Sequence, residues 1–305
     1  MNIRKKLVTQ ATDLIDALNG TFGRHAGFRA SHAKGFAVTG NFLPDTASNG
    51  VEIPLLSLPV DVKARFSVGG GKPGISDKSP TVRGIGLEFA SPTEKWSMAL
   101  ISAPVFFANS AEQFREFLAA RVPDPEIGGP NPDKVQAFNA ANPNTVPHQL
   151  HLKNTPPCLS YTTEFYHSGH AYGFTVGGER VDARIMLEPE QGRVGLTEDQ
   201  MAAFPDNYLQ DRLREELLDG PARWTLKLVV ANADDNLGDP TEPWTGDNSS
   251  IPLGTLEITA EDPTDAGQER VFDPSNMPEG VHAPKDDVFN LRSPAYAVSV
   301  GRRAS

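Results

Sequence analysis

The sequence predicts an α+β fold, in which antiparallel strands joined by short turns form a meander or barrel flanked by helices. Two patterns indicate it. Residues 60–68 alternate between apolar and polar side chains, as expected of a strand with one buried face. Residues 7–18 carry their apolar side chains at helical spacing instead. The 27 Gly and 26 Pro among 305 residues suit many turns without indicating low complexity.

The elements follow in order along the chain. An N-terminal helix is predicted over 1–20, with Gly20 as its stop. Ser110 and Gln113 have the spacing of a capping box, which predicts a helix over 110–121. The glycine-rich stretch 69–74 lacks the spacing of a phosphate loop and is interpreted as a turn. Further strands are predicted at 83–89, 96–100, 173–176, 183–187, 224–230 and 253–259, and another helix at 206–219.

Residues 122–160 are rich in Pro and Asn, and we interpret them as a long irregular segment that wraps around other structure. No linker divides the chain cleanly, so residues 1–305 are expected to form one domain, with 285–305 as its closing segment. One face of the opening helix is expected to pack either on the body of the protein or on a partner chain.

Composition excludes several classes of protein. A formal net charge of −11 opposes binding to nucleic acid. A single cysteine, Cys158, excludes an intrachain disulfide framework and a multi-thiolate metal site, and we expect it to be a buried apolar residue. The start of the chain is too polar for an export signal, and no window approaches the ~18 apolar residues of a membrane span. A cytoplasmic location is therefore expected.

The histidines are the first candidates for chemistry. His148 and His151, like His167 and His170, are three residues apart, a spacing that on a helix directs two imidazoles to one metal. Both pairs lie among Pro, Gly and Ser, so we interpret them as loop histidines. His32 lies just before an apolar strand, and by itself it indicates little.

Five segments of the chain are informative only when taken together and in order. They are Arg29–Gly35, Val62–Ser67, Thr81–Phe89, Trp96–Phe107 with Phe114, and Arg292–Tyr296. This ordered set resembles the haem catalases. The chain stops nine residues after Tyr296, so it is most similar to the short branch of the family, the catalase-related peroxidases. The resemblance implies an eight-stranded antiparallel β-barrel with flanking helices and without the C-terminal helical extension of full-length catalases.

The resemblance also implies a homo-oligomer, with the opening helix as a means of pairing subunits. It further implies a haem b cofactor and a role for each matching residue. Tyr296 corresponds to the axial ligand of the haem iron, and Arg292 to the arginine that stabilises its phenolate. His32 corresponds to the acid–base group that moves a proton between the two oxygens of the peroxide, which leads to an oxoferryl haem. Ser67 corresponds to the serine that orients the histidine ring.

The remaining matches concern the haem periphery. Arg29, Arg65 and Arg303 correspond to arginines that pair with the two haem propionates. Phe106 and Phe114 correspond to aromatic residues of the haem pocket.

The chain departs from the family pattern at two positions. Where full-length catalases carry a distal asparagine that helps to hold a second peroxide, this chain has Ile101, which offers no hydrogen bond. Pro294 lies between Arg292 and Tyr296, where it either kinks a helix or forms its first turn after Ser293.

We therefore expect a haem peroxidase that reduces hydrogen or organic peroxides with a small organic electron donor and has weak catalase activity. A fatty-acid hydroperoxide isomerase or lyase on the same scaffold is the first alternative. The second is a non-catalytic haem-binding protein, which would have no use for the proton shuttle at His32. The third is a haem-free barrel that binds a small molecule, which would leave Arg29, Arg65 and Arg303 without a common purpose.

Overall fold

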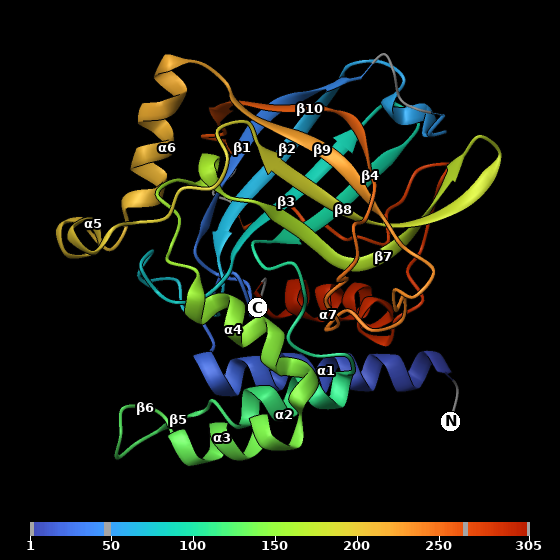
Figure 1. The fold of residues 1–305 in the computed structure, drawn as a ribbon. Helices are drawn as coiled ribbons and strands as arrows, with labels where there is room; N and C mark the ends of the chain where they lie inside the picture. Colours follow the sequence, from blue (N-terminus) through green and yellow to red (C-terminus); the bar gives the residue numbers. More distant parts are fainter. Residues whose placement is uncertain (1–2, 46–49, 265–267, 304–305) are drawn as a thin grey trace.

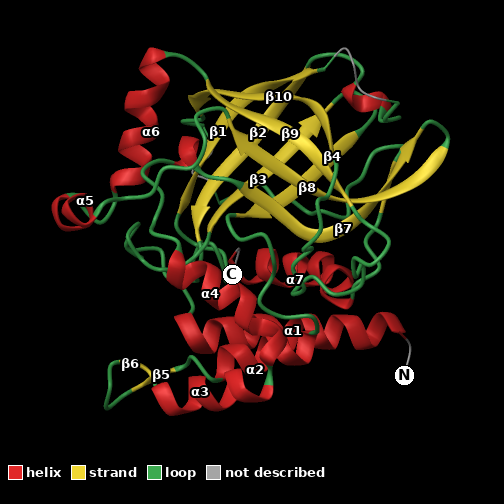
Figure 2. Cartoon of the chain, viewed as in Figure 1, coloured by secondary structure: helices red, strands yellow, loops and turns green. Residues whose placement is uncertain are grey.

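The computed structural model describes residues 3–45, 50–264 and 268–303. A twisted barrel of long strands stands on a layer of helices (Figure 1, Figure 2). The long strands are β1 (Gly35–Pro44), β2 (Val60–Val68), β3 (Arg83–Ala90), β4 (Lys95–Ile101), β7 (Tyr166–Val176), β8 (Glu179–Pro189), β9 (Ala222–Val230) and β10 (Ser250–Glu261).

The strand order closes the barrel. Neighbouring strands run β7-β4-β3-β2-β1-β10-β9-β8, and β7 also pairs with β8, so this eight-stranded circuit has no free edge. All of its pairings are antiparallel. The expected eight-stranded antiparallel barrel is therefore confirmed. Among the residues that the structure describes, three two-residue strands lie outside it: β5 (Pro123–Asp124), β6 (Gly129–Pro130) and β11 (Val281–His282).

The alternation that predicted strand β2 decides what faces the core. Val62, Ala64 and Phe66 are fully buried in the barrel, where aromatic rings fill much of the space. The outward-facing residues Arg65 and Ser67 are also buried, against the expectation that such positions meet solvent. Helices and loops cover this outer face, which creates a second, more polar interior next to the apolar core.

The helices form a layer of their own next to the barrel (Figure 1). In Figure 1, α1, α2, α3 and α7 lie together below the barrel, and α6 lies beside it. Apolar side chains of α1, α2 and α7 build a core of their own, separate from that of the barrel. The helices are α1 (Ile3–Phe22), α2 (Ala111–Ala119), α3 (Pro132–Ala141), α4 (Val146–Asn154), α5 (Glu198–Ala203), α6 (Tyr208–Asp219) and α7 (Asp287–Arg303).

The structure corrects the interpretation of residues 122–160 as irregular. This segment contains helices α3 and α4, each with a proline in its first turn. Proline there removes only an N–H that has no partner within the helix, so it starts a helix as readily as it ends one. Helix α1 also continues past Gly20 to Phe22. Nowhere in the described ranges is a helix long and apolar enough to cross a membrane.

Candidate active site

His32 lies in the loop between α1 and β1, against the covered outer face of the barrel. Its Nδ1 is 2.9 Å from Ser67 Oγ, and that hydroxyl donates its one hydrogen to the carbonyl oxygen of Gly84 at 3.3 Å. Because the hydroxyl hydrogen is used in this way, the serine oxygen accepts from an Nδ1–H. The arrangement leaves the lone pair of the His32 ring on Nε2, which is the atom able to take up a proton.

The surroundings of His32 keep its imidazole neutral. Burial, followed by the charges of Arg65, Arg292 and Arg29, lowers the pKa of His32 to about 3. Its backbone has a φ of 54°, and no other non-glycine residue in the described parts of the chain has a positive φ. Such strained conformations cluster at functional sites, where the surrounding structure enforces them.

Glycine at position 84 makes room for the histidine ring. Gly84 pairs with Ser67 on one side and with Ile101 on the other. A Cβ atom at this position would lie 2.8 Å from the Cε1 and Nδ1 atoms of His32 and from Ser67 Oγ. The histidine, the serine and the glycine therefore form one tightly packed unit.

We expect Gly84→Ala to slow the reaction with peroxide at least tenfold, because the new methyl group displaces the His32 ring. Overpacking of this kind also costs roughly 1–3 kcal/mol of the free energy of unfolding. Rapid-mixing spectroscopy and thermal unfolding measure the two effects. The matched control is Gly74→Ala, since a Cβ there meets no atom within 4 Å. Wild-type peroxide kinetics in Gly84→Ala would contradict this packing argument.

A second pair of predicted residues lies on helix α7. Arg292 donates to the hydroxyl oxygen of Tyr296 at 2.8 Å and also reaches the carbonyl oxygen of Ala99 on β4 at 3.4 Å. Burial by itself lowers the pKa of Arg292, but the phenol groups of Tyr296 and Tyr172 outweigh it and raise that pKa. Ala99 pairs with Gly86, two residues along β3 from Gly84, against which the His32 ring packs. Helix α7 and the histidine loop therefore lie beside neighbouring positions of the sheet, and the charge of Arg292 contributes to the lowered pKa of His32.

Pro294 does not interrupt this geometry. It lies inside α7, which begins seven residues earlier at Asp287, so the alternative in which Pro294 starts the helix is wrong. The helix continues through it, and Arg292 and Tyr296 face each other across one turn.

A buried hydrogen bond between a histidine and an aspartate supports the start of α7, and sequence reasoning missed it. Burial lowers the pKa of His170, so its imidazole is neutral. His170 Nδ1 is 2.8 Å from Asp286 Oδ2, and both side chains are 1% exposed. Asp286 also accepts from the backbone N–H of Phe289, in the first turn of α7. His170 lies on strand β7 and not in a loop, which corrects the earlier interpretation. The sequence does contain a signal for Asp286, because aspartate is a preferred residue at the position directly before a helix.

Two of the three arginines predicted to surround a haem reach the same segment of the chain, and the third is bonded to the histidine loop. Arg65 is 4% exposed and donates to the carbonyl oxygen of Ala33 at 3.2 Å. Arg29 donates to the carbonyl oxygen of Arg270 at 2.6 Å, and Arg303 to that of Glu269 at 3.4 Å. Arg29 and Arg303, from opposite ends of the chain, thus reach adjacent residues.

The predicted pocket aromatics also meet. The ring centroids of Phe106 and Phe114 are 5.8 Å apart in an edge-to-face arrangement. The ring centroid of Phe106 lies 6.3 Å from that of His170, which places it close to the His170–Asp286 hydrogen bond. Ile101 ends strand β4 and pairs with Gly84, so it is one strand away from the position that contacts His32.

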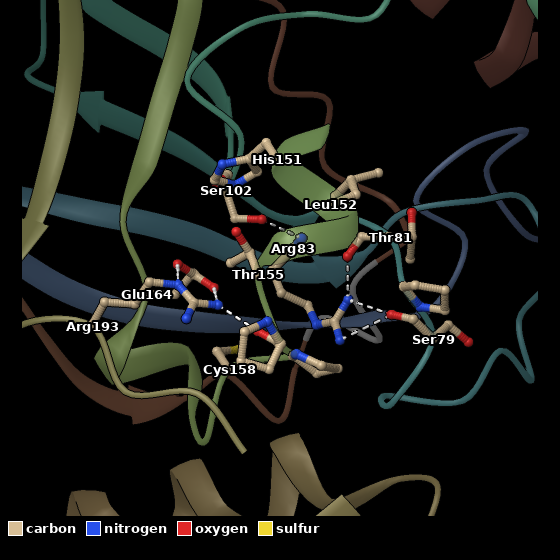
Figure 3. Close-up of a pocket in the computed structure, with 13 residues that line it drawn as sticks. Ser79, Thr81, Arg83, Ser102, His151, Leu152, Thr155, Cys158, Glu164 and Arg193 are labelled. Atoms are coloured by element: carbon tan, nitrogen blue, oxygen red, sulfur yellow. Dashed lines mark hydrogen bonds and ion pairs between the residues drawn. The ribbon is translucent and has the colours of Figure 1, made fainter. Parts of the chain in front are cut away.

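A separate hollow near β3 contains none of these residues (Figure 3). Its volume is about 20 Å³, which is room for little more than one water molecule. It lies between Arg83, His151 and the ion pair of Arg193 with Glu164. Cys158 lines it, and burial raises the pKa of this thiol to about 12, so it is unreactive, as expected for a buried apolar residue.

His148 and His151 lie on helix α4, which corrects their interpretation as loop residues. The imidazoles contact the backbone carbonyl oxygens of Val105 and Ser102 at 2.9 and 3.0 Å. These two hydrogen bonds hold α4 against the turn that follows β4. No cluster of His, Cys, Asp and Glu suited to a metal ion occurs in the described part of the molecule.

The comparisons with known proteins define the class. A family model described as catalase matches residues 4–304, so the chain belongs to the catalase family, a family of haem enzymes that act on peroxide. The chain is 34% identical over 296 residues to a catalase-related peroxidase of Synechococcus elongatus, covering 95% of this chain and 87% of that protein. Another catalase-related peroxidase, from Mycolicibacterium paratuberculosis, is 29% identical, with 95% and 93% covered.

Solved structures agree on the fold. Catalase A from Saccharomyces cerevisiae superposes with a TM-score of 0.81 at 22% identity, over 92% of this chain and 62% of that one. A fungal catalase also gives a TM-score of 0.81, with 60% of its length covered. The chain thus spans about three fifths of the length of these catalases.

The described residues suit the cofactor of this family. Haem carries two carboxylates, and the charges of Arg29 and Arg65 that act on His32 are of the sign and kind that bind them. The Tyr296 oxygen, already hydrogen-bonded to Arg292, is a donor of the kind that ligates haem iron. The donor set therefore fits haem.

Proposed function

We propose that this chain is a haem b peroxidase that reduces hydrogen peroxide or organic peroxides with a small organic electron donor. The observation that carries the proposal is the site enclosed by a neutral His32 and the Arg292–Tyr296 pair. A protein that only stores haem has no use for a proton acceptor held in a strained backbone conformation. A homo-oligomeric state, a single domain and a cytoplasmic location stay predictions from the sequence.

Tyr296 and Arg292 would hold the cofactor. Tyr296 would bind the iron through its phenol oxygen, and the guanidinium of Arg292 would stabilise the negative charge on that oxygen. Arg29, Arg65 and Arg303 would bind the propionates, while Phe106 and Phe114 would form part of the pocket wall. When bound, haem supplies the redox chemistry that splits the O–O bond.

His32 would move the proton. Its Nε2 takes a proton from one oxygen of the peroxide and delivers it to the other, so that water leaves and not hydroxide. Ser67 keeps this nitrogen available by fixing the other ring nitrogen as a donor. Ser67 is therefore a positioning residue, and His32 is the catalytic one.

Ile101 supports a peroxidase with weak catalase activity. A catalase must hold a second peroxide molecule as its reductant, and an isoleucine side chain offers that molecule no hydrogen bond. An organic donor would then supply most of the electrons. The test measures oxygen release from peroxide alone and donor oxidation in parallel, and vigorous oxygen release would overturn the proposal.

We expect Ile101→Asn to raise the rate of oxygen release from peroxide roughly tenfold, about the effect of one added hydrogen bond of ~1.4 kcal/mol. An oxygen electrode measures this rate, with donor oxidation measured on the same preparation. Ile101→Val is the control, because it changes the volume and adds no polar atom. If both variants release oxygen at the wild-type rate, position 101 does not limit catalase activity.

A further inference from the structure

A polar hollow opens beside the proposed haem arginines. It measures about 400 Å³, which lies in the size range of sites for small organic molecules. Its described lining contains charged and hydroxyl side chains and no aromatic ring. These residues are Lys63, Asp262, Thr264, Glu269 and Arg270.

Two connections link this hollow to the site. The carbonyl oxygens of Glu269 and Arg270, whose side chains line the hollow, accept hydrogen bonds from Arg303 and Arg29. Lys63 and Arg65 are two residues apart on strand β2 and therefore project from the same face, about 7 Å from each other. A molecule in the hollow would thus lie directly outside the arginines that we assign to the propionates.

The charges in the hollow occur in pairs of opposite sign. Lys63 Nζ is 3.4 Å from Asp262 Oδ2, and the Lys63 side chain is 44% exposed, so it can reach a ligand. Arg270 is held by Glu88 at 2.6 Å, a carboxylate that is 9% exposed. A ligand that fits this lining needs hydroxyl groups, which can donate to a carboxylate and accept from an ammonium group at once.

We propose that this hollow binds the electron donor, and that the donor is a small molecule with two hydroxyls on adjacent unsaturated carbons, an enediol or a catechol. The inference rests on the proposed function. Oxidation breaks two O–H bonds of the donor and releases two electrons and two protons. Hydrogen peroxide accepts both, its O–O bond breaks, and two waters form; an organic peroxide gives one water and one alcohol. The carboxylate of Glu269 is placed to accept a donor proton.

The test measures binding of catechol to the holoenzyme. Isothermal titration calorimetry gives the Kd, and the paramagnetic relaxation of the catechol ring protons by the haem iron shows whether the bound molecule is close to the cofactor. Neither readout depends on turnover. The comparison ligand is 2-methoxyphenol, which has the same ring but only one free hydroxyl.

The variants are Glu269→Gln, Lys63→Gln and the double variant. Asp262 is left intact, because its carboxylate also accepts from the backbone N–H and the hydroxyl of Thr264. We expect each single change to raise the Kd for catechol about fivefold and the double change at least tenfold, as for hydrogen bonds to partly exposed charged groups. The matched control is Arg180→Ala, which removes an exposed ion pair with Asp182.

The outcomes separate the two proposals. An unchanged Kd in the double variant, or equal binding of catechol and 2-methoxyphenol by the wild type, overturns the donor site and leaves the proposed function intact. Weakened catechol binding in a holoenzyme that oxidises no donor supports the site for a vicinal dihydroxy ligand and overturns the proposed function. A higher Kd together with a higher KM for catechol, at an unchanged rate of reaction with peroxide, supports both.

Discussion

Replacing His32 with alanine is expected to slow the reaction with peroxide by a factor of roughly 10²–10⁴, the usual contribution of a general acid–base group. The variant loses the group that we assign to take up the peroxide proton, so hydroxide and not water must leave the peroxide. Haem content should not change, because no residue assigned to hold haem is altered. Rapid-mixing absorption spectroscopy of the haem-loaded protein measures the rate.

Two further variants make this test specific. Ser67→Ala removes the hydrogen bond at Nδ1 but leaves the imidazole, so we expect a smaller loss, about tenfold. His25→Ala changes a histidine that contacts the carbonyl oxygen of Phe22 on the preceding helix, and it should have no effect on the rate. A His32→Ala protein that reacts with peroxide at the wild-type rate would exclude the proton shuttle.

The pH dependence of the same rate gives an independent check. The neutral imidazole is the active form, and the pKa of His32 is lowered to about 3. We therefore expect the rate constant to stay level between pH 5 and pH 8 and to fall only in stronger acid. A midpoint near 6.5, the ordinary value for histidine, would show that the ring is not desolvated as described.

The lowered pKa also affects stability. The unfolded chain binds a proton on this residue near pH 6.5, whereas the folded chain binds it only near pH 3. As the pH falls through this window, the unfolded state takes up a proton that the folded state refuses. His32 therefore destabilises the fold progressively below pH 6.5 and has no such effect above it.

Local patterns predicted most of the barrel, because each strand shows its own buried face. Strand β2 illustrates this, since its alternation is visible in nine consecutive residues. Helices α3 and α4 were not predicted, because a proline that starts a helix and one that ends it look alike without the neighbouring structure. The closure of the circuit by β7 and β8 came only from the family resemblance, not from any local pattern.

The residues of the candidate site also fall into those that could be predicted from the sequence and those that only the structure shows. His32, Ser67, Arg292 and Tyr296 were predicted from the family resemblance, and the structure brings each pair within hydrogen-bonding distance. The role of Gly84 depends instead on the register between β2 and β3, which local sequence does not determine. His170 and Asp286 are 116 residues apart in the chain, and only the packing of β7 against α7 joins them.

Removing the phenol oxygen of Tyr296 tests the other face of the site. We expect Tyr296→Phe to weaken haem binding between about tenfold and a hundredfold. The iron loses its proposed ligand, and Arg292 loses its hydrogen-bond acceptor inside a buried site. Haem titration of the apoprotein measures the affinity. The ferric absorption spectrum reports whether tyrosinate ligation, with its charge-transfer band, is lost.

Tyr172→Phe is the matched control for this experiment. Tyr172 is also buried and also acts on Arg292, and burial raises the pKa of its phenol. It lies on β7, packed against Phe289 of α7, so its hydroxyl can be removed without touching the assigned iron ligand. If Tyr172→Phe loses haem while Tyr296→Phe retains it with an unchanged spectrum, the axial ligand has been assigned to the wrong tyrosine. If neither variant changes affinity or spectrum, the iron is not held by a phenolate in this chain.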